Sequence, residues 1–183
     1  MKKLLSLLLL AAASLGAFLA LGGCGGSSRA ASGDIVDDCV DGGVTRRHSY
    51  DAPKAIASTE IAALDTNFFL YDEDGGGTSW IFSVRREGDA FLLSVRKRGK
   101  EAVEKPVGRD FLGEVHAVIM KHGLPRLNGF DEVTSGLPYE YAPCSLSADY
   151  ASGERLYFHM DGNPEAEWAR ELRNLFLRAL GER

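Results

Sequence analysis

The chain has 183 residues, with 26 acidic against 21 basic side chains and a formal net charge of −5. This length suits one domain that buries a core, together with an extension. The acidic balance argues against nucleic acid as a partner, because nucleic-acid binding needs a basic stripe, and against electrostatic docking on anionic lipid.

The chain begins with a pattern typical of a secretory signal. Lys2 and Lys3 precede a run without charge at residues 4–21, and small residues stand before Cys24. A basic start, an apolar core and small residues at the cut predict a signal peptide at residues 1–23. The alternative is a retained transmembrane helix, for which this run has the minimum length, but Gly16, Gly22 and Gly23 weaken a permanent helix.

The four residues Leu21-Gly22-Gly23-Cys24 resemble the lipobox of bacterial lipoproteins. The resemblance implies that the signal is cut before Cys24 and that this cysteine carries the lipid. Two or three acyl chains anchor a protein stably, so no further membrane segment is required. We therefore expect a protein of the cell envelope that is anchored to a membrane through its N-terminal lipid and faces outside the cytoplasm.

Residues 24–50 are expected to form the lipidated cysteine and a flexible tether. The first part is rich in glycine and serine and has no apolar face to bury. Residues 34–50 carry acids and then bases with few apolar residues, which predicts irregular structure with one short strand near Val44. A single domain is expected over residues 51–183.

Two cysteines remain besides the one in the lipobox. Cys39 and Cys144 would lie in an exported and oxidising setting, where a pair of thiols favours a disulfide. The other interpretation is two separate thiols, with Cys144 buried at the start of a strand. We favour the disulfide, which would fix the end of the tether against the domain.

Alternation of apolar and polar residues predicts a series of strands in the first half of the domain. The expected strands lie, in chain order, at residues 54–58, 60–71, 80–85, 91–96 and 101–107. Glu87-Gly88-Asp89 supplies a turn that makes a hairpin of the third and fourth. Lys105 and Pro106 suit the last strand to a sheet edge.

A helix and a second hairpin follow. Asp110 is a favourable N-cap for a helix that runs to His122, and Gly123 is suited to end it. The second hairpin is expected at residues 145–150 and 155–160.

The last predicted element is a helix with Asn163 as its cap, Pro164 in its first turn and Gly181 at its end. The order of strands, helix, strands and helix shows no βαβ alternation. It predicts an α+β fold, in which an antiparallel sheet of hairpins has two helices packed on one face.

A group of basic residues on the first hairpin is the candidate binding site. We expect them at neighbouring ends of two paired strands, where they would hold an anionic partner or headgroup. The alternative is a charged edge that keeps the sheet soluble. The group consists of Arg85, Arg86, Arg96, Lys97, Arg98 and Lys100.

The sequence offers weak signals for metal binding and catalysis. The four histidines lack the i, i+4 spacing of a metal pair on a helix, and the acidic stretch 72–77 does not fit a calcium loop. Cys144 with His159 or His116 would make a thiol–imidazole pair, but no motif around the thiol supports one. We predict no metal, no cofactor and no catalytic residue.

The C-terminal pattern is similar to the ending of uncharacterised domains in small bacterial lipoproteins. It comprises the turn Tyr150-Ala151-Ser152-Gly153-Glu154 and then Gly162-Asn163-Pro164 before the last helix. This resemblance implies the order of the fold and no activity. We expect a binding module for an envelope protein or a small ligand. The alternatives are an envelope or extracellular hydrolase with a dispersed active site, and a structural spacer.

Overall fold

The computed structural model describes residues 35–40, 44–71, 76–134, 143–161 and 166–181, the first of these ranges by its backbone alone. The expected signal peptide and lipobox lie outside the described residues. Within the described ranges, no helix has the length and apolar character needed to cross a bilayer.

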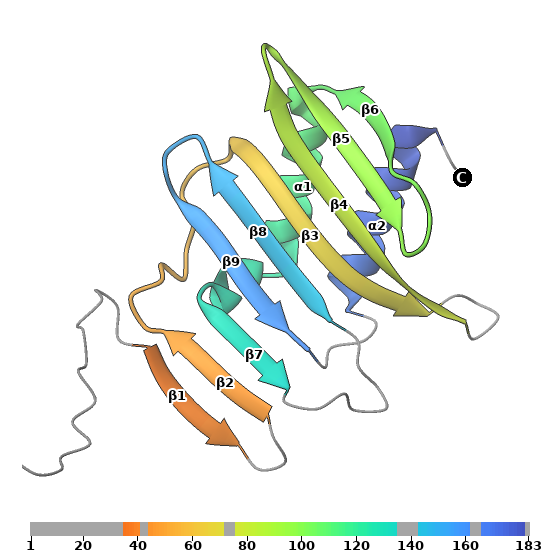
Figure 1. Ribbon diagram of the computed structural model, residues 1–183. Coiled ribbons are helices and arrows are strands. Elements are labelled where there is room, and N and C mark those ends of the chain that lie inside the picture. Colours follow the sequence, from red (N-terminus) through yellow and green to blue (C-terminus); the bar gives the residue numbers. More distant parts are fainter. Residues whose placement is uncertain (1–34, 41–43, 72–75, 135–142, 162–165, 182–183) are drawn as a thin grey trace, which may run out of the picture. The chain divides into compact units, whose positions relative to one another are not determined.

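The described strands form one nine-stranded sheet in the order β1-β2-β7-β9-β8-β3-β4-β5-β6 (Figure 1). Neighbouring strands run antiparallel except β7 and β9, which are parallel. The strands are β1 (Ile35–Val40), β2 (Val44–Ser49), β3 (Ile61–Tyr71), β4 (Gly77–Glu87), β5 (Ala90–Lys97), β6 (Val103–Val107), β7 (Phe130–Thr134), β8 (Cys144–Tyr150) and β9 (Arg155–Met160).

Two α-helices, α1 (Arg109–Lys121) and α2 (Glu167–Leu180), lie on the same face of the sheet (Figure 1). A short 3-10 helix, η1 (Leu124–Leu127), follows α1. This arrangement confirms the predicted α+β fold. Among the described residues, no helix covers the other face of the central strands, and we call it the open face.

The ends of the helices differ in part from the prediction. The N-cap of α1 is Gly108, and the expected cap Asp110 lies in the first turn, where a carboxylate interacts favourably with the helix dipole. The described part of α2 has Ala166 at its N-cap, and the expected cap Asn163 lies outside the described residues. Gly181 ends α2 in the left-handed conformation, as predicted.

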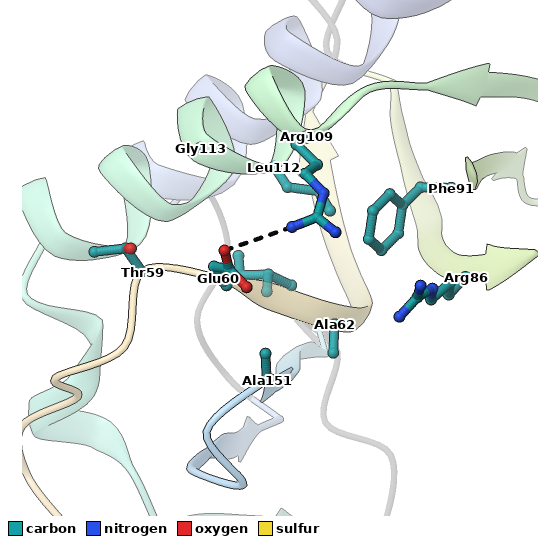
Figure 2. A pocket seen from close by; sticks show the side chains of 10 residues that line it. Thr59, Glu60, Ala62, Arg86, Phe91, Arg109, Leu112, Gly113 and Ala151 are labelled. Carbon is teal, nitrogen blue, oxygen red and sulfur yellow. Dashed lines mark hydrogen bonds and ion pairs between the residues drawn. The ribbon is translucent and has the colours of Figure 1, made fainter. Parts of the chain in front are cut away.

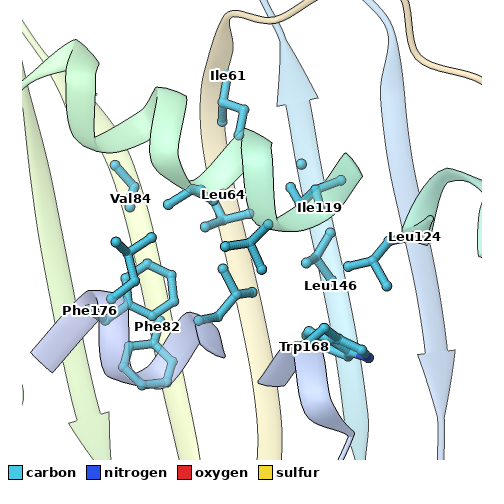
Figure 3. Close-up of a cluster of buried hydrophobic side chains, with 14 of the residues drawn as sticks. Ile61, Leu64, Phe82, Val84, Ile119, Leu124, Leu146, Trp168 and Phe176 are labelled. Carbon is cyan, nitrogen blue, oxygen red and sulfur yellow. The ribbon is translucent and has the colours of Figure 1, made fainter. Parts of the chain in front are cut away.

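The core lies between the sheet and the two helices (Figure 3). Phe82 of β4 stacks on Phe176 of α2, with ring centroids 4.4 Å apart. Trp168 of α2 meets the rings of Phe68 and Phe158 edge-on, at 5.8 and 5.6 Å. These aromatic contacts join α2 to strands of both predicted hairpins.

Three parts of the secondary structure differ from the prediction, one of which is the unexpected strand β7. The range 34–50, which we expected to be irregular with one short strand, contributes both β1 and β2 to the sheet. The sheet therefore starts before residue 51. Conversely, the expected strand 54–58 is irregular, because the Glu154 carboxylate accepts the backbone N–H groups of Ala57 and Ser58 at 2.8 and 2.9 Å.

Candidate functional site

The basic residues of the first hairpin do not gather at one place, contrary to the prediction. Arg85 and Arg86 lie beside the turn that joins β4 to β5, since Arg86 is paired with Phe91. Arg96 is paired with Ile81, four residues before Arg85 on β4, which is about 13 Å along the strand. The turn therefore places the two arginines and the four later basic residues at opposite ends of the hairpin.

The turn end of the hairpin borders a partly open pocket of about 140 Å³ (Figure 2). Its walls come from the start of β3, the first turns of α1, the β4–β5 hairpin and the turn between β8 and β9. The buried side chains of Ile61, Phe91 and Leu112 make its lining largely apolar. We call this space the α1 pocket.

Charged side chains surround the mouth of the α1 pocket. Arg109 and Glu60 form an ion pair, with 3.5 Å between Nη1 and Oε1 (Figure 2). Arg86 donates a hydrogen bond from Nε to the carbonyl oxygen of Gly88 at 2.9 Å, which holds its guanidinium near the pocket. The N-cap of α1, Gly108, has no side chain that could cap the helix, so the positive end of the helix dipole adds to the two guanidinium charges.

The far end of the hairpin carries the remaining basic residues. Arg96, Arg98 and Lys100 line a shallow hollow on the open face. Lys97 points to the opposite, helix-covered face, where its Nζ lies 5.3 Å from the ring centroid of Trp80. This cation–π contact separates Lys97 from the other three basic residues.

The predicted disulfide between Cys39 and Cys144 is not formed in this structure. Cys144 is a free, fully buried thiol at the start of β8, as the alternative interpretation expected. Cys39 lies on β1, and three strands separate β1 from β8 in the sheet. Four strand spacings are about 19 Å, far beyond the distance of about 7 Å that a disulfide spans.

Cys144 has the environment of a core residue and does not suit a nucleophile. Burial raises the pKa of its thiol to about 12, whereas a reactive cysteine needs a lowered pKa. The neighbouring residue Ser145 points to the open face, because successive side chains of a strand alternate. The thiol–imidazole pair of Cys144 with His159 is excluded, since His159 is paired with Ser145 and shares its face.

A histidine and a buried carboxylate form a second polar cluster beside β9. His159 Nε2 lies 2.8 Å from Asp161 Oδ1, and the other oxygen of Asp161 accepts the backbone N–H of Thr134 at 2.6 Å. Asp161 is only 4% exposed, and these two contacts fix the orientation of its carboxylate. Within the described ranges, no group of three or more histidine, cysteine, aspartate or glutamate residues has a geometry that would hold a metal ion.

Comparison of the chain with protein-family models, with curated proteins and with solved structures found no match.

Sequence reasoning placed Arg86 in a binding site but missed its companions in the α1 pocket. Arg109 and Glu60 are 49 positions apart, and no local pattern connects them. The only signal in the sequence was that Arg109 immediately precedes the predicted start of a helix.

Proposed function

We propose that this protein is a lipid-anchored binding module of the cell envelope that holds a small organic carboxylate in the α1 pocket. One observation carries this proposal: Arg86 and Arg109 stand at the mouth of a partly open pocket with a largely apolar lining. Guanidinium groups bind carboxylates through directed, charge-assisted hydrogen bonds. A mostly apolar pocket with a few convergent polar groups is the usual form of a small-molecule site.

The size of the α1 pocket narrows the ligand. A cavity of about 150 Å³ holds one benzene molecule, and the volume of the α1 pocket is close to this value. The proposed ligand therefore has a ring or a branched alkyl group of that size, placed against Ile61, Phe91 and Leu112. Its carboxylate points outward to the two arginines.

The test measures binding of phenylacetate to the purified full-length protein by titration calorimetry. Benzyl alcohol supplies the same ring without the charge and should bind at least about tenfold more weakly, the factor that corresponds to one charge-assisted contact. Arg109→Gln should weaken phenylacetate binding by a similar factor, and Arg98→Gln, at the other end of the hairpin, should leave it unchanged. Equal affinities for phenylacetate and benzyl alcohol would contradict the proposal.

The lipid anchor is supported by the resemblance of Leu21-Gly22-Gly23-Cys24 to a lipobox and requires its own test. Cells that express the protein are supplied with labelled palmitate, and incorporation into the chain is measured. Cys24→Ala should abolish the label, while Cys39→Ala should retain it. Undiminished labelling of the Cys24 variant would refute the anchor.

One observation favours the alternative function, an envelope or extracellular hydrolase. Ser145 lies opposite His159 on paired strands, and the buried carboxylate of Asp161 orients one ring nitrogen of that histidine. In this alternative, the other ring nitrogen takes the proton of the Ser145 hydroxyl as its oxygen attacks an acyl carbon, and gives it to the leaving group as the scissile bond breaks; water then hydrolyses the acyl-enzyme. A fluorophosphonate probe should label the protein and fail to label Ser145→Ala, whereas Ser147→Ala should still react. Absence of labelling would remove this alternative.

A further inference from the structure

One wall of the α1 pocket is a face of the helix itself. Arg109, Leu112 and Gly113 line the pocket from α1, at the spacing of i, i+3 and i+4 that places residues on one side of a helix (Figure 2). Arg109 contributes a charge and Leu112 contributes an apolar side chain. Gly113 contributes no side chain, so the wall of the pocket is bare at this position.

The interior of a helix is an unfavourable place for a glycine. Gly113 lies within α1, four residues after its first residue and eight before its last. Glycine destabilises a helix relative to alanine, because its backbone loses more conformational freedom on folding. A fold requires glycine at such a place either for a special backbone conformation or for lack of space.

Neither the backbone nor the packing of the fold requires glycine at position 113. Its φ is not positive, in contrast to that of Gly88 and Gly129, so alanine would adopt the same conformation without strain. A Cβ built on Gly113 meets no atom of the described chain within 4 Å. An alanine side chain would therefore enter open space at the wall of the α1 pocket.

Gly113 lies one helical turn beyond Arg109. Four residues advance a helix by about 6 Å and bring the chain back to the same side. A ligand whose carboxylate meets Arg109 and whose ring lies along α1 against Leu112 has its opposite end near Gly113. In a phenyl ring this end is the para position, the point of the ring farthest from the carboxylate.

We propose that Gly113 is the specificity-determining residue of the α1 pocket, because the missing side chain admits a substituent at the para position of the ligand ring. The ring fills the benzene-sized volume of the pocket, and the substituent extends past it into the open space at Gly113. This inference rests on the proposed function and deepens it, since it narrows the ligand to a para-substituted arylcarboxylate.

The test measures binding of phenylacetate and of its 4-methyl and 2-methyl derivatives to the purified full-length protein by titration calorimetry. The 4-methyl group reaches Gly113, whereas the 2-methyl group lies beside the carboxylate and does not. The parent protein should bind 4-methylphenylacetate about two- to fourfold more tightly than phenylacetate, the factor that corresponds to burial of up to one methyl group.

Gly113→Ala should reverse this preference. The added methyl group occupies the space of the para substituent, so the affinity for 4-methylphenylacetate should fall about tenfold. The affinities for phenylacetate and for 2-methylphenylacetate should change less than about twofold, because neither ligand extends to Gly113.

The melting temperature of the same variant separates a role in binding from a role in the fold. Gly113→Ala should raise it by about 2–4 °C, since alanine is the better helix former. Ala117→Gly is the matched control, because it makes the reverse exchange one turn further along α1, at an exposed residue outside the α1 pocket. It should lower the melting temperature by a similar amount and leave all three affinities unchanged.

Three results would overturn the inference. The first is a lower melting temperature of Gly113→Ala, which would show that the fold itself requires this glycine. The second is an unchanged ratio of the affinities for 4-methylphenylacetate and phenylacetate in Gly113→Ala, and this result would leave the proposed function standing. The third is no binding of any of the three ligands to the parent protein, which would refute the proposed function as well.

Discussion

Glu60 and Arg109 form an ion pair across the mouth of the α1 pocket, with 3.5 Å between Oε1 and Nη1. Both side chains are about two-thirds exposed, so water screens their attraction. Glu60 therefore uses part of the hydrogen-bonding capacity of the Arg109 guanidinium, which we propose binds the carboxylate of the ligand. The pair is weak enough for a ligand to displace.

Glu60→Gln should therefore strengthen binding of phenylacetate. Removal of a competing carboxylate and of its repulsion should lower the dissociation constant about two- to fivefold, in line with the small free energies of exposed ion pairs. Titration calorimetry of the variant beside the parent protein measures this change. Glu87→Gln is the control, because it removes a carboxylate that forms an ion pair with Arg85 on the β4–β5 hairpin. Unchanged or weaker binding by Glu60→Gln would contradict the assignment of Arg109.

Asn128 should be among the most sensitive polar positions of the fold. Its side chain is 3% exposed and donates to the carbonyl oxygens of Pro53 and Arg155, and it accepts the backbone N–H of Tyr157. Asn128→Ala leaves these three backbone groups without their partner. We expect a loss of about 2–4 kcal/mol in the free energy of unfolding, measured by urea denaturation.

The control for Asn128 is the exposed residue Asn174 on α2. Asn174→Ala should change the unfolding free energy by less than about 0.5 kcal/mol. Similar values for the two variants would show that the three hydrogen bonds of Asn128 do not stabilise the fold.

Two glycines with positive φ should respond differently to alanine. Gly129 has φ +76°, and a Cβ added there would lie 2.7 Å from the Cβ of Ala52 and 2.9 Å from that of Ser49. Gly88 has φ +61° and nothing within 4 Å of an added Cβ. Gly88→Ala should cost about 1 kcal/mol from the backbone conformation alone. Gly129→Ala should cost at least about 1 kcal/mol more because of the steric overlap, and thermal unfolding of both variants compares them.

Cys144 should make the fold sensitive to alkali. Its thiol pKa is raised from 9.0 to about 12 by burial, so the folded protein keeps a proton that the unfolded chain loses. Stability from this group is complete below pH 9 and is lost as the pH rises toward 12, by about 2–3 kcal/mol at pH 11. Tyr150, whose pKa is also raised to about 12, acts in the same direction.

Urea denaturation between pH 8 and pH 11, which spans the ordinary pKa of the thiol, tests this dependence. Cys144→Ala should flatten it, and Ser145→Ala, one position away on the open face, should leave it as in the parent protein. An equally steep loss of stability in Cys144→Ala would show that other groups cause the alkaline sensitivity.

The hairpins and helices were predictable because their sequence patterns are local. Phe82 and Val84 alternate with polar neighbours on β4, and the turn at Gly88 is marked in the sequence. β7 (Phe130–Thr134) and β1 were not predicted, because strands of mixed polarity show no apolar period and are defined by their pairing partners. The strand expected at residues 54–58 fails because distant Glu154 takes its backbone N–H groups.

The candidate site was predictable only in part for the same reason. The position of the hairpin turn alone would have separated Arg86 from Arg96, because Arg86 lies close to the turn in the sequence and Arg96 lies far from it. Arg86 and Arg109 line the same pocket because of the way α1 crosses the sheet. That crossing is set by packing of the core, and no sequence pattern near either residue indicates it.

The single parallel pairing in the sheet has a consequence for how the molecule opens. β7 meets β9 through two residue pairs, Phe130 with Phe158 and Asp131 with His159, whereas longer registers join the central strands. No side chain of β2 or β7 is fully buried, and those of β3 and β8 are buried at every second position over most of their length. We therefore expect β1, β2 and β7 to open as one unit, so that their amide hydrogens exchange with solvent while the central strands and both helices stay intact.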